Sequence, residues 1–295
     1  MKVNLAPFKF RDVMVNAGGP VKTVDVGAES IFGREQYSAA AYLKDELRLD
    51  CDLPDGVGSA NDPTTAKFRA VSEALERWAF RQCKLEEPVT YGFDYDPTTN
   101  GMGAYPGLFS KDARQSAERE AIERHVLILW WEGYLECHLL GDPFPGVRAI
   151  RIENPFSEHE VVLLWQFLNE RFYTYGFGLA ANVNEACWRA GVEMHRLSGV
   201  IGEHYQKYDN LDLDYINQAK HLFEKRTLFF SRPEGFVNLL KRVESHPEHV
   251  YCSKPVTLID RKVSGPWDQY VTVWRVVFEQ PSREFINDRA DYFFW

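Results

Sequence analysis

The sequence predicts a mixed α/β (α+β) fold, with mixed sheets and long helices, on the strength of three features. Three long segments repeat apolar positions at helical spacing. Segments that alternate or run apolar like strands lie before, between and after them. A pair of glycines one residue apart precedes each long segment. The predicted helices span residues 64–84, 111–133 and 185–203, and the predicted strands span residues 21–26, 147–152, 159–168, 172–180, 250–263 and 270–278.

The composition describes a globular chain and excludes several classes of function. With 295 residues, 45% of them hydrophobic, the chain can bury a large core and is not disordered. Its formal net charge of -9 disfavours nucleic-acid binding, which needs a basic face. No apolar run approaches the length of a membrane span. We therefore expect a cytoplasmic protein that binds neither membranes nor nucleic acid.

Residues 1–50 are expected to form an N-terminal segment that is integrated into the fold. Within it, residues 37–49 have the pattern of a helix. No low-complexity linker separates this segment from residues 51–295. One continuous domain is therefore expected.

Turn-forming residues mark the remaining connections. Residues 51–63 are rich in turn formers, and residues 94–105 form a loop; each holds a glycine pair. The strand at residues 172–180 is expected to enter a third glycine turn. Residues 211–240 are predicted to be helical, with breaks at Arg232-Pro233 and at Gly235.

The cysteines indicate structural thiols in a reducing compartment. Their number is odd, and no two of them form a CxxC pair. Cys137-His138 and the pair His246 and His249 offer soft metal ligands, but without the spacing of a zinc site. The five cysteines are Cys51, Cys83, Cys137, Cys187 and Cys252.

The glycine pairs begin three copies of one internal repeat. Counted from the first glycine, the first and third copies have alanine ten residues on, arginine thirteen, alanine fourteen and glutamate seventeen. The middle copy carries two extra loop residues and has serine in place of the arginine. The copies comprise Gly56, Ala66, Arg69, Ala70, Glu73 and Glu76; Gly101, Ala113, Ser116, Ala117, Glu120 and Glu123; and Gly176, Ala186, Arg189, Ala190, Glu193 and Arg196.

Each copy places acidic and basic side chains on one helix face, because residues three or four apart are neighbours on a helix. A single face of this kind is typical of a solvated helix with weak ion pairs. Three copies at matching offsets favour a function instead. The faces carry Glu73, Glu76 and Arg77; Glu120, Glu123 and Arg124; and Arg189, Glu193 and Arg196.

These faces predict a site for a magnesium nucleoside triphosphate. Clustered glutamates repel one another unless a cation lies between them, and Mg²⁺ takes carboxylate and phosphate oxygens. Arginines such as Arg77 would then face the phosphates. Glycine turns such as the one at Gly101 would leave N–H groups free to approach the same anion. The site is not a P-loop, because GxxxxGK[ST] is absent.

Four stretches resemble motifs of the YcaO family, and together they cover about residues 50 to 280. TNGMG and KDARQSAEREAIERHV (residues 111–126) resemble the family's SNG turn and ExxER helix. GVGSANDPTTAKFRAVSEALERW (residues 56–78) resembles its GKG turn followed by SxxxExxER. FGLAANVNEACWRAGVEMHR (residues 177–196) resembles its FGAHPD…ALxRxxxExxQ segment, and VWRVV (residues 273–277) its final RVxVPG strand.

The resemblance implies that residues 51–295 form an ATP- and Mg²⁺-dependent enzyme domain acting on a peptide. In the family, a Cys, Ser or Thr side chain attacks a backbone amide, whose oxygen is phosphorylated by ATP. Loss of phosphate then leaves a thiazoline or oxazoline. Other members use sulfide or an amine and form thioamides or amidines. The expected function is cyclodehydration in the biosynthesis of a ribosomally made, bacteriocin-like peptide.

Site residues follow from the motif positions. Asp112 lies where the family has a nucleotide-contacting glutamate, and no catalytic residue beyond the binding groups can be named. The resemblance implies that Asp112, Arg124 and Arg189 bind ATP. Arg77 and Gly101 are expected to bind it with them. The resemblance also implies that magnesium is bound by Glu73, Glu76, Glu120, Glu123 and Glu193.

Two arginines depart from the family pattern. Arg69 replaces a serine, and Arg196 replaces a glutamine. Either cation could bind phosphate or displace a magnesium ion. The alternative function is therefore a non-catalytic YcaO-like subunit that binds a peptide or a partner protein. A third alternative is an unrelated ATP-dependent ligase with a glutamate-lined magnesium site.

The expected partners are a precursor peptide and a separate leader-peptide-binding or E1-like protein, because no stretch resembles a fused peptide-recognition domain. A flavin-dependent dehydrogenase is a further possible partner in an oligomer or complex. The aromatic residues 291–295, DYFFW, are expected to dock on the chain's own fold or on a partner.

Overall fold

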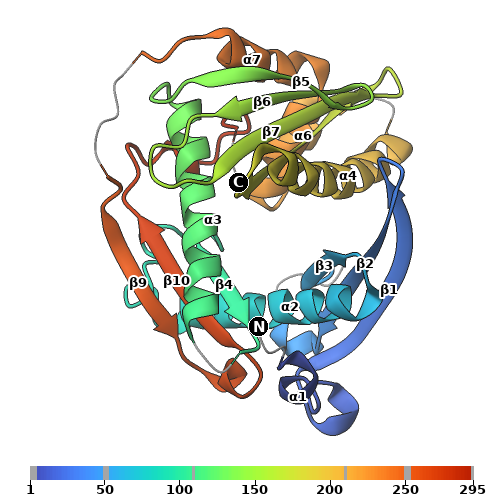
Figure 1. Cartoon of the computed structure of the whole chain (residues 1–295), viewed down its shortest axis with the longest axis vertical. Helices are drawn as coiled ribbons and strands as arrows, with labels where there is room; N and C mark the ends of the chain where they lie inside the picture. The colour runs from blue at the N-terminus through green and yellow to red at the C-terminus, as the bar shows by residue number, and fades with distance from the viewer. Residues whose placement is uncertain (1–4, 49–52, 108–109, 209–210, 249–253, 294–295) are drawn as a thin grey trace. The chain divides into compact units, whose positions relative to one another are not determined.

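The computed structural model describes residues 5–48, 53–107, 110–208, 211–248 and 254–293. The chain divides into two compact units, drawn together in Figure 1. Unit 1 comprises Met1–Ala121 and Val256–Glu279, and unit 2 comprises Ile122–Pro255 and Gln280–Trp295. The boundary falls inside one helix, α3 (Ser110–Trp131).

Unit 1 contains two antiparallel sheets and the helix α2 (Pro63–Glu86). The first sheet has the order β1-β2-β3, and α2 packs on all three of its strands. The second sheet has the order β4-β10-β9, and α2 also contacts β4. The strands are β1 (Val21–Ile31), β2 (Arg34–Leu43), β3 (Gly56–Ala60), β4 (Met102–Tyr105), β9 (Thr257–Val263) and β10 (Thr272–Phe278). Short helices are α1 (Ala6–Lys9), η1 (Val15–Ala17), η2 (Asp45–Leu47) and η3 (Pro266–Gln269).

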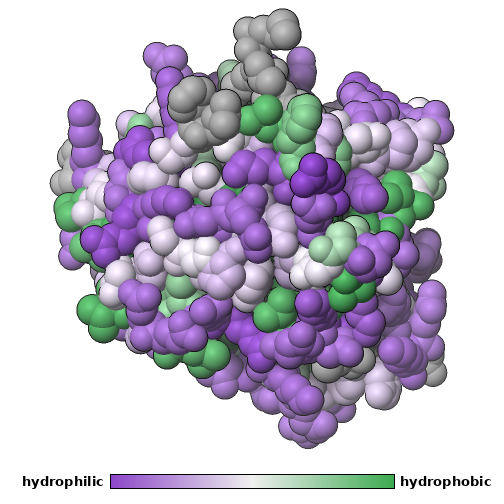
Figure 2. All heavy atoms as spheres, turned by 90° about the horizontal axis from the view of Figure 1, so that it is seen from below, coloured by the Kyte–Doolittle hydropathy of each residue, from purple (hydrophilic) through white to green (hydrophobic). Residues whose placement is uncertain are grey.

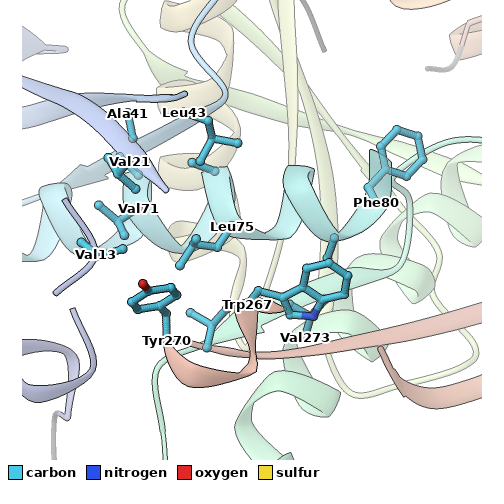
Figure 3. Packing of buried hydrophobic residues seen from close by; sticks show 14 of the residues in the cluster. Val13, Val21, Ala41, Leu43, Val71, Leu75, Phe80, Trp267, Tyr270 and Val273 are labelled. Carbon is cyan, nitrogen blue, oxygen red and sulfur yellow. The ribbon is translucent and has the colours of Figure 1, made fainter. Parts of the chain in front are cut away.

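The core of unit 1 joins segments that are far apart in sequence. Val71 and Leu75 of α2 belong to one buried cluster with Leu43 of β2, and the Leu75 side chain lies on the side of α2 toward Tyr270 and Trp267 (Figure 3). All of these side chains are buried. The N-terminal segment contributes Ala6, Phe10, Val13 and Val21 to this cluster.

Unit 2 contains one antiparallel sheet of order β5-β6-β7-β8, and α4 packs on β7 and β8. The strands are β5 (Cys137–Phe144), β6 (Val147–Ile152), β7 (Glu160–Leu168) and β8 (Phe172–Ala180). The helices are α4 (Val183–Lys207), α5 (Leu213–Asn217), α6 (Leu222–Ser231), α7 (Pro233–Glu244) and the short η4 (Glu284–Ile286).

The long helices begin where the sequence supplies a cap. The Asp62 side chain accepts a hydrogen bond from the Thr65 N–H at 2.8 Å, and Pro63 takes the first helical position of α2. The Asn182 side chain accepts from the Glu185 N–H at 3.0 Å at the start of α4. All three predicted long helices are confirmed by α2, α3 and α4.

The helix predicted at residues 37–49 is wrong, because residues 34–43 form strand β2. Alanine favours a helix locally, but β2 pairs with β1 on one side and β3 on the other. Ala39, Ala41 and Leu43 alternate as buried residues facing the core. Tertiary pairing therefore overrides local propensity in this segment.

The predicted glycine turns are largely strands. Gly56 and Gly58 lie in β3, Gly176 and Gly178 lie inside β8, and Gly103 lies in β4. Only Gly101 is in a turn, with φ +69°, directly before β4. The glycines are required by close approach: a Cβ at Gly58 would lie 2.2 Å from the Ala66 carbonyl oxygen, and one at Gly176 would lie 2.3 Å from that of Ala190.

The other predicted segments are mostly confirmed. β6, β7 and β10 match the predicted strands closely, and the helix break at Arg232 separates α6 from α7. The break predicted at Gly235 is wrong, since this residue lies within α7 against the Phe229 backbone. The strand predicted from residue 250 begins at Thr257 among the described residues. Cys51, Cys252 and His249 lie outside the described residues.

The C-terminal prediction is confirmed for two residues. Tyr292 and Phe293 are 4% and 1% exposed and pack on unit 2. Phe294 and Trp295 lie outside the described residues. No helix in the described part of the chain combines the length and apolar character needed to cross a membrane. On the face drawn in Figure 2, hydrophilic residues predominate and hydrophobic ones form small scattered groups.

Candidate functional site

The internal repeat is a structural unit in which a strand orients a glutamate of the following helix. In unit 1, the Val57 N–H, between Gly56 and Gly58, donates to Glu73 Oε2 at 3.3 Å. In unit 2, the N–H between the two glycines of β8 belongs to Phe177 and donates to Glu193 Oε2 at 3.2 Å. Each donation fixes one carboxylate oxygen of the glutamate, and the second oxygen of Glu73, Oε1, faces Arg77 Nη2 at 3.4 Å.

The arginines of the repeat are also structurally equivalent. Arg69 Nη1 donates to the carbonyl oxygen of Ser59 in β3. Arg189 Nη1 donates to the carbonyl oxygen of Leu179 in β8 at 3.1 Å, and its Nη2 pairs with Glu185 Oε1 at 2.6 Å. Arg69, a departure from the YcaO motif, therefore has the same strand-binding role as Arg189, which fits that motif.

In unit 1, three glutamates come together: Glu73, Glu76 and Glu120. Burial is the main cause that raises the pKa of Glu76 well above its usual value, and the charges of Glu120 and Glu73 raise it further. Arg77 and the Ala104 N–H of β4 oppose this shift. Arg77 Nη2 lies 3.4 Å from Glu73 Oε1. Glutamates of α2 and α3 therefore lie close together within unit 1.

Arg275 of β10 lies close to this cluster and was not singled out as a site residue from the sequence. Its side chain is fully buried and donates to three carbonyl oxygens, those of Asp96 at 2.8 Å, Thr98 at 2.9 Å and Asn100 at 2.6 Å. It thereby fixes the loop that leads to Gly101. The signal in the sequence was an arginine inside an otherwise apolar strand.

The charge of Arg275 acts on the unit 1 glutamates. Burial lowers the pKa of this guanidinium, and the carboxylates of Asp96, Glu120 and Glu76 oppose that effect. A buried cation therefore compensates part of the negative charge of the cluster.

In unit 2, Glu123 of α3 and Glu193 of α4 form a second, partly buried acidic pair. Burial raises the pKa of Glu193 to about 7, with Glu123 raising it further and Arg124, the Phe177 N–H and Arg196 opposing the shift. Burial also raises the pKa of Glu123, and its opposing groups are Arg124, the Leu179 N–H and Arg189. The repeat thus brings carboxylates together in both units.

Arg124 is the central cation of the unit 2 cluster. Its side chain is 14% exposed, and its Nη1 lies 3.9 Å from Glu123 Oε1. Its guanidinium lies over the ring of Phe177, 5.0 Å from the ring centre. The residue whose N–H orients Glu193 therefore also supports Arg124.

These carboxylates fit a divalent cation. The raised pKa values of Glu76 and Glu193, which are partly buried, indicate that negative charge is costly at both clusters. Oriented, partly hydrogen-bonded carboxylates are suitable ligands for Mg²⁺, which prefers oxygen. The other expected nucleotide contacts are less defined: Asp112 is half-buried in the first turn of α3, and the Gly101 carbonyl accepts from the Val276 N–H at 2.8 Å.

Gly101 has a structural reason to be glycine. Its φ is positive, and a Cβ there would lie 2.0 Å from the Val276 carbonyl oxygen. These contacts account for the glycine without a nucleotide, so its assignment as an ATP contact stays a prediction.

Comparison with known proteins identifies the fold. No protein-family model matches the chain, and no curated protein sequence matches it. Several solved structures are similar, including the following two. One is YcaO from Methanopyrus kandleri bound with AMPPCP and Mg²⁺, with a TM-score of 0.52, 13% identity and coverage of 91% of this chain and 86% of that chain. The other is the E. coli microcin synthetase McbBCD complex with pro-MccB17 bound, with a TM-score of 0.55, 12% identity and coverage of 87% of each chain.

The chain has the YcaO fold. The resemblance stated from the motifs is thus confirmed at the level of the fold, across nearly the whole chain. In this YcaO fold, α2, α3 and α4 carry all five glutamates that the sequence assigned to magnesium. The binding of magnesium by each of these glutamates stays a prediction.

Among the described residues of unit 2, a further cluster of ligand-type side chains lies at β5 and β6. Glu136, His138 and Glu153 bring one ligand atom each within 4.8 Å of the others, and all three are exposed. His138 Nε2 lies 3.3 Å from Glu153 Oε1. The Cys137 thiol, next to His138 in sequence, instead donates to the Val243 carbonyl oxygen at 3.5 Å. The sequence indicated Cys137-His138 as soft metal ligands but did not indicate that Glu136 and Glu153 lie beside His138.

Proposed function

We propose that this protein is an ATP- and Mg²⁺-dependent enzyme that activates a backbone amide of a ribosomally made peptide. The observation that carries the proposal is the repeated geometry of Glu73 and Glu193. Each is held on one oxygen by the N–H between two strand glycines, in a chain with the YcaO fold. Two structures with this fold are described as bound with AMPPCP and Mg²⁺ and as a complex with pro-MccB17. These descriptions support ATP, magnesium and a peptide as ligands here.

In unit 1, the three clustered glutamates would bind magnesium, and Arg77 would neutralise phosphate charge beside Glu73. Asp112 and Gly101 are proposed as further nucleotide contacts. The Ala104 N–H and the Val57 N–H keep two of the carboxylates oriented before any ion binds.

In unit 2, Glu123 and Glu193 would bind magnesium, and Arg124 and Arg189 would hold phosphate oxygens. Magnesium, when bound, supplies positive charge that stabilises phosphoryl transfer. The protein's own contribution is to place carboxylates and guanidinium groups before the reaction, which avoids reorganisation during it. Phe177 contributes by orienting Glu193 and supporting Arg124.

The proposed reaction is cyclodehydration. A Cys, Ser or Thr side chain of the peptide attacks the preceding carbonyl carbon, ATP phosphorylates the amide oxygen, and phosphate leaves with that oxygen. The product is a thiazoline or oxazoline, with ADP and phosphate released. Formation of a thioamide or an amidine would use the same activation with sulfide or an amine as nucleophile.

One observation favours the alternative of a non-catalytic subunit that binds peptide or a partner protein. Arg196 acts on Glu193 electrostatically and opposes the rise of its pKa. A guanidinium close to this carboxylate could take the place of a magnesium ion. Arg69 gives no such support, because it donates to the strand carbonyl in the same way as Arg189.

Calorimetry of ATP binding with and without millimolar Mg²⁺ tests the proposal. We expect magnesium-dependent binding, and loss of about tenfold or more in affinity for Glu120→Gln. Glu118→Gln is the matched control, because Glu118 lies on the same helix but pairs with Arg114 at 3.7 Å and is exposed. Absence of ATP binding by the unaltered protein would overturn the catalytic proposal in favour of the alternative.

Mass spectrometry of the peptide product identifies the reaction. Co-production with a precursor peptide and a leader-binding or E1-like partner should remove one water per ring formed. Replacement of oxygen by sulfur would instead indicate a thioamide. Further loss of two hydrogens per ring would indicate that a flavin-dependent dehydrogenase acts after this enzyme.

A further inference from the structure

The C-terminal segment is fixed to unit 2 by a buried arginine. Arg226 of α6 donates to the carbonyl oxygens of Phe285 at 2.8 Å, Asn287 at 2.9 Å and Arg289 at 3.0 Å. Its guanidinium also lies over the Tyr292 ring, 4.9 Å from the ring centre. The main chain leading to Phe293 is therefore held along its length.

Tyr292 adds a second attachment. Its hydroxyl donates to Glu132 Oε1 at 2.7 Å, just beyond the end of α3. Its ring also packs against that of Trp131, with the centres 6.1 Å apart. These two attachments place Phe293 in the interior of unit 2.

Phe293 is 1% exposed and lies among aromatic rings from three elements. Its edge-to-face partner Phe177 has its ring centre 6.3 Å away, at an interplanar angle of 85°. Such pairs have a preferred geometry, so each ring restrains its neighbours. The other surrounding rings are Trp130, Trp131, Tyr175 and Phe230.

Phe177 connects this aromatic cluster to the unit 2 glutamates. Its main chain is fixed, because Gly176 and Gly178 lie against the backbone of α4 and its own N–H binds Glu193. With the main chain fixed, the ring of Phe177 can move only by rotation about its side-chain bonds. That ring carries the guanidinium of Arg124. The packing against Phe293 is thus a restraint on the surface beneath Arg124.

From this geometry we infer that Phe293 is a positioning residue for Arg124, acting through the ring of Phe177. The inference deepens the proposed function, because Arg124 is there assigned to phosphate binding. Removal of the Phe293 ring would leave a cavity into which Phe177 can turn. Arg124 would then lose its aromatic support, and its attraction to the ring face with it.

The direct test is nuclear magnetic resonance of the arginine Nε–H groups in the protein without nucleotide. The Arg124 resonance, assigned by its loss in Arg124→Lys, should be displaced by the ring current of Phe177. We expect Phe293→Leu to move it to the position that it takes in Phe177→Leu. Phe293→Tyr, which keeps the ring, should leave it in place. If Phe293→Leu does not fold, Phe293→Met supplies a longer, flexible side chain that can fill an irregular gap without a ring, and it should shift the resonance in the same direction.

The matched control is Phe236→Leu. Phe236 is fully buried in the same unit, but the rings that it contacts are those of Trp165 and Tyr173. This variant should leave the Arg124 resonance unchanged. An unmoved resonance in Phe293→Leu, or an equal shift in Phe236→Leu, would overturn the inference.

Nucleotide binding separates this inference from the proposed function. If Arg124 holds phosphate, Phe293→Leu should weaken Mg²⁺-dependent ATP binding about tenfold, or about 1.4 kcal/mol. The loss should largely vanish in an Arg124→Lys background, because the two changes act on one contact. If the unaltered protein binds no ATP, the proposed function fails, and the resonance alone decides the inference. Equal losses in both backgrounds would contradict it.

Discussion

At the scale of single residues, the candidate site depends on carboxylates whose ionisation is opposed by their surroundings. Glu76 and Glu193 are each partly buried beside another glutamate, and their pKa values rise. Each is also bound by a strand N–H, which favours the ionised form and fixes its orientation. These carboxylates therefore favour a bound cation, while the strand N–H groups keep their orientation fixed.

The pKa of Glu193 predicts a dependence of stability on pH in the absence of magnesium. Its folded-state pKa of about 7 lies above the unfolded value, so the folded state binds this proton more tightly. The stabilisation is fully present below the unfolded pKa and is lost as pH rises through about 7. Relative to Glu193→Gln, the unaltered protein should lose on the order of 1 kcal/mol of unfolding free energy between about pH 5 and about pH 8.

Urea unfolding at a series of pH values measures this difference. Comparison with Glu193→Gln is needed because His125 acts in the opposite direction. Its pKa is lowered by burial to about 4, so its contribution to stability is lost as pH falls. A difference between the two proteins that stays constant over this range would contradict the assignment.

At the scale of elements, close packing of a glycine-bearing strand on an alanine-bearing helix explains the internal repeat. A Cβ at Gly58 would meet the backbone of α2 at Ala66, and a Cβ at Gly178 would lie 2.6 Å from the Ala186 carbonyl oxygen. This approach brings the strand N–H groups within reach of the glutamates. The glycines therefore serve the site through packing.

Gly58→Ala should destabilise unit 1 strongly. The new methyl group meets backbone atoms that cannot move without shifting β3 from α2, so we expect a loss of about 2 kcal/mol or more in unfolding free energy. Gly27→Ala is the control, because a Cβ at Gly27 in β1 has no neighbour within 4 Å. The control should change stability by less than about 1 kcal/mol. Similar denaturation midpoints for the two variants would refute this account of the repeat.

The sequence allowed prediction of what is local and periodic. The three long helices, most strands and the shared helix faces of the repeat followed from spacing, because a helix places residues three and four apart together. The assignment of the five glutamates to magnesium stays a prediction. The glycine pairs were misread as turns, since a glycine needed for close approach and one needed for a positive φ look alike in sequence. Residues 37–49 were misread because their alanines serve a buried strand. Arg275 was missed because the loop carbonyls that it binds are distant in sequence.

At the scale of the whole molecule, each unit is completed by a segment from the far end of the chain. Val256–Glu279 returns to unit 1 and supplies β9, β10 and the buried Trp267. Gln280–Trp295 belongs to unit 2 and supplies Tyr292 and Phe293 to its interior. Contacts of this kind cannot be predicted from local patterns, because they pair residues far apart in sequence, from 59 positions for Arg226 and Phe285 to 258 for Asp12 and Tyr270. The aromatic composition of residues 291–295 was the only local sign of one of them.

Removal of residues 291–295 should therefore destabilise unit 2. The change deletes Tyr292 and Phe293, which are buried, and it leaves a cavity among Trp131, Phe230 and their neighbours. Loss of a buried aromatic side chain alone costs about 3 kcal/mol or more, so we expect at least that reduction in unfolding free energy. Urea unfolding followed by circular dichroism measures it. Asp291→Ala is the control: this side chain forms only a partly exposed pair with Arg289 at 3.0 Å, and its loss should cost less than about 1 kcal/mol. A truncated protein that unfolds at the same urea concentration as the Asp291→Ala variant would show that the segment does not support unit 2, and the restraint on Phe177 would then need another source.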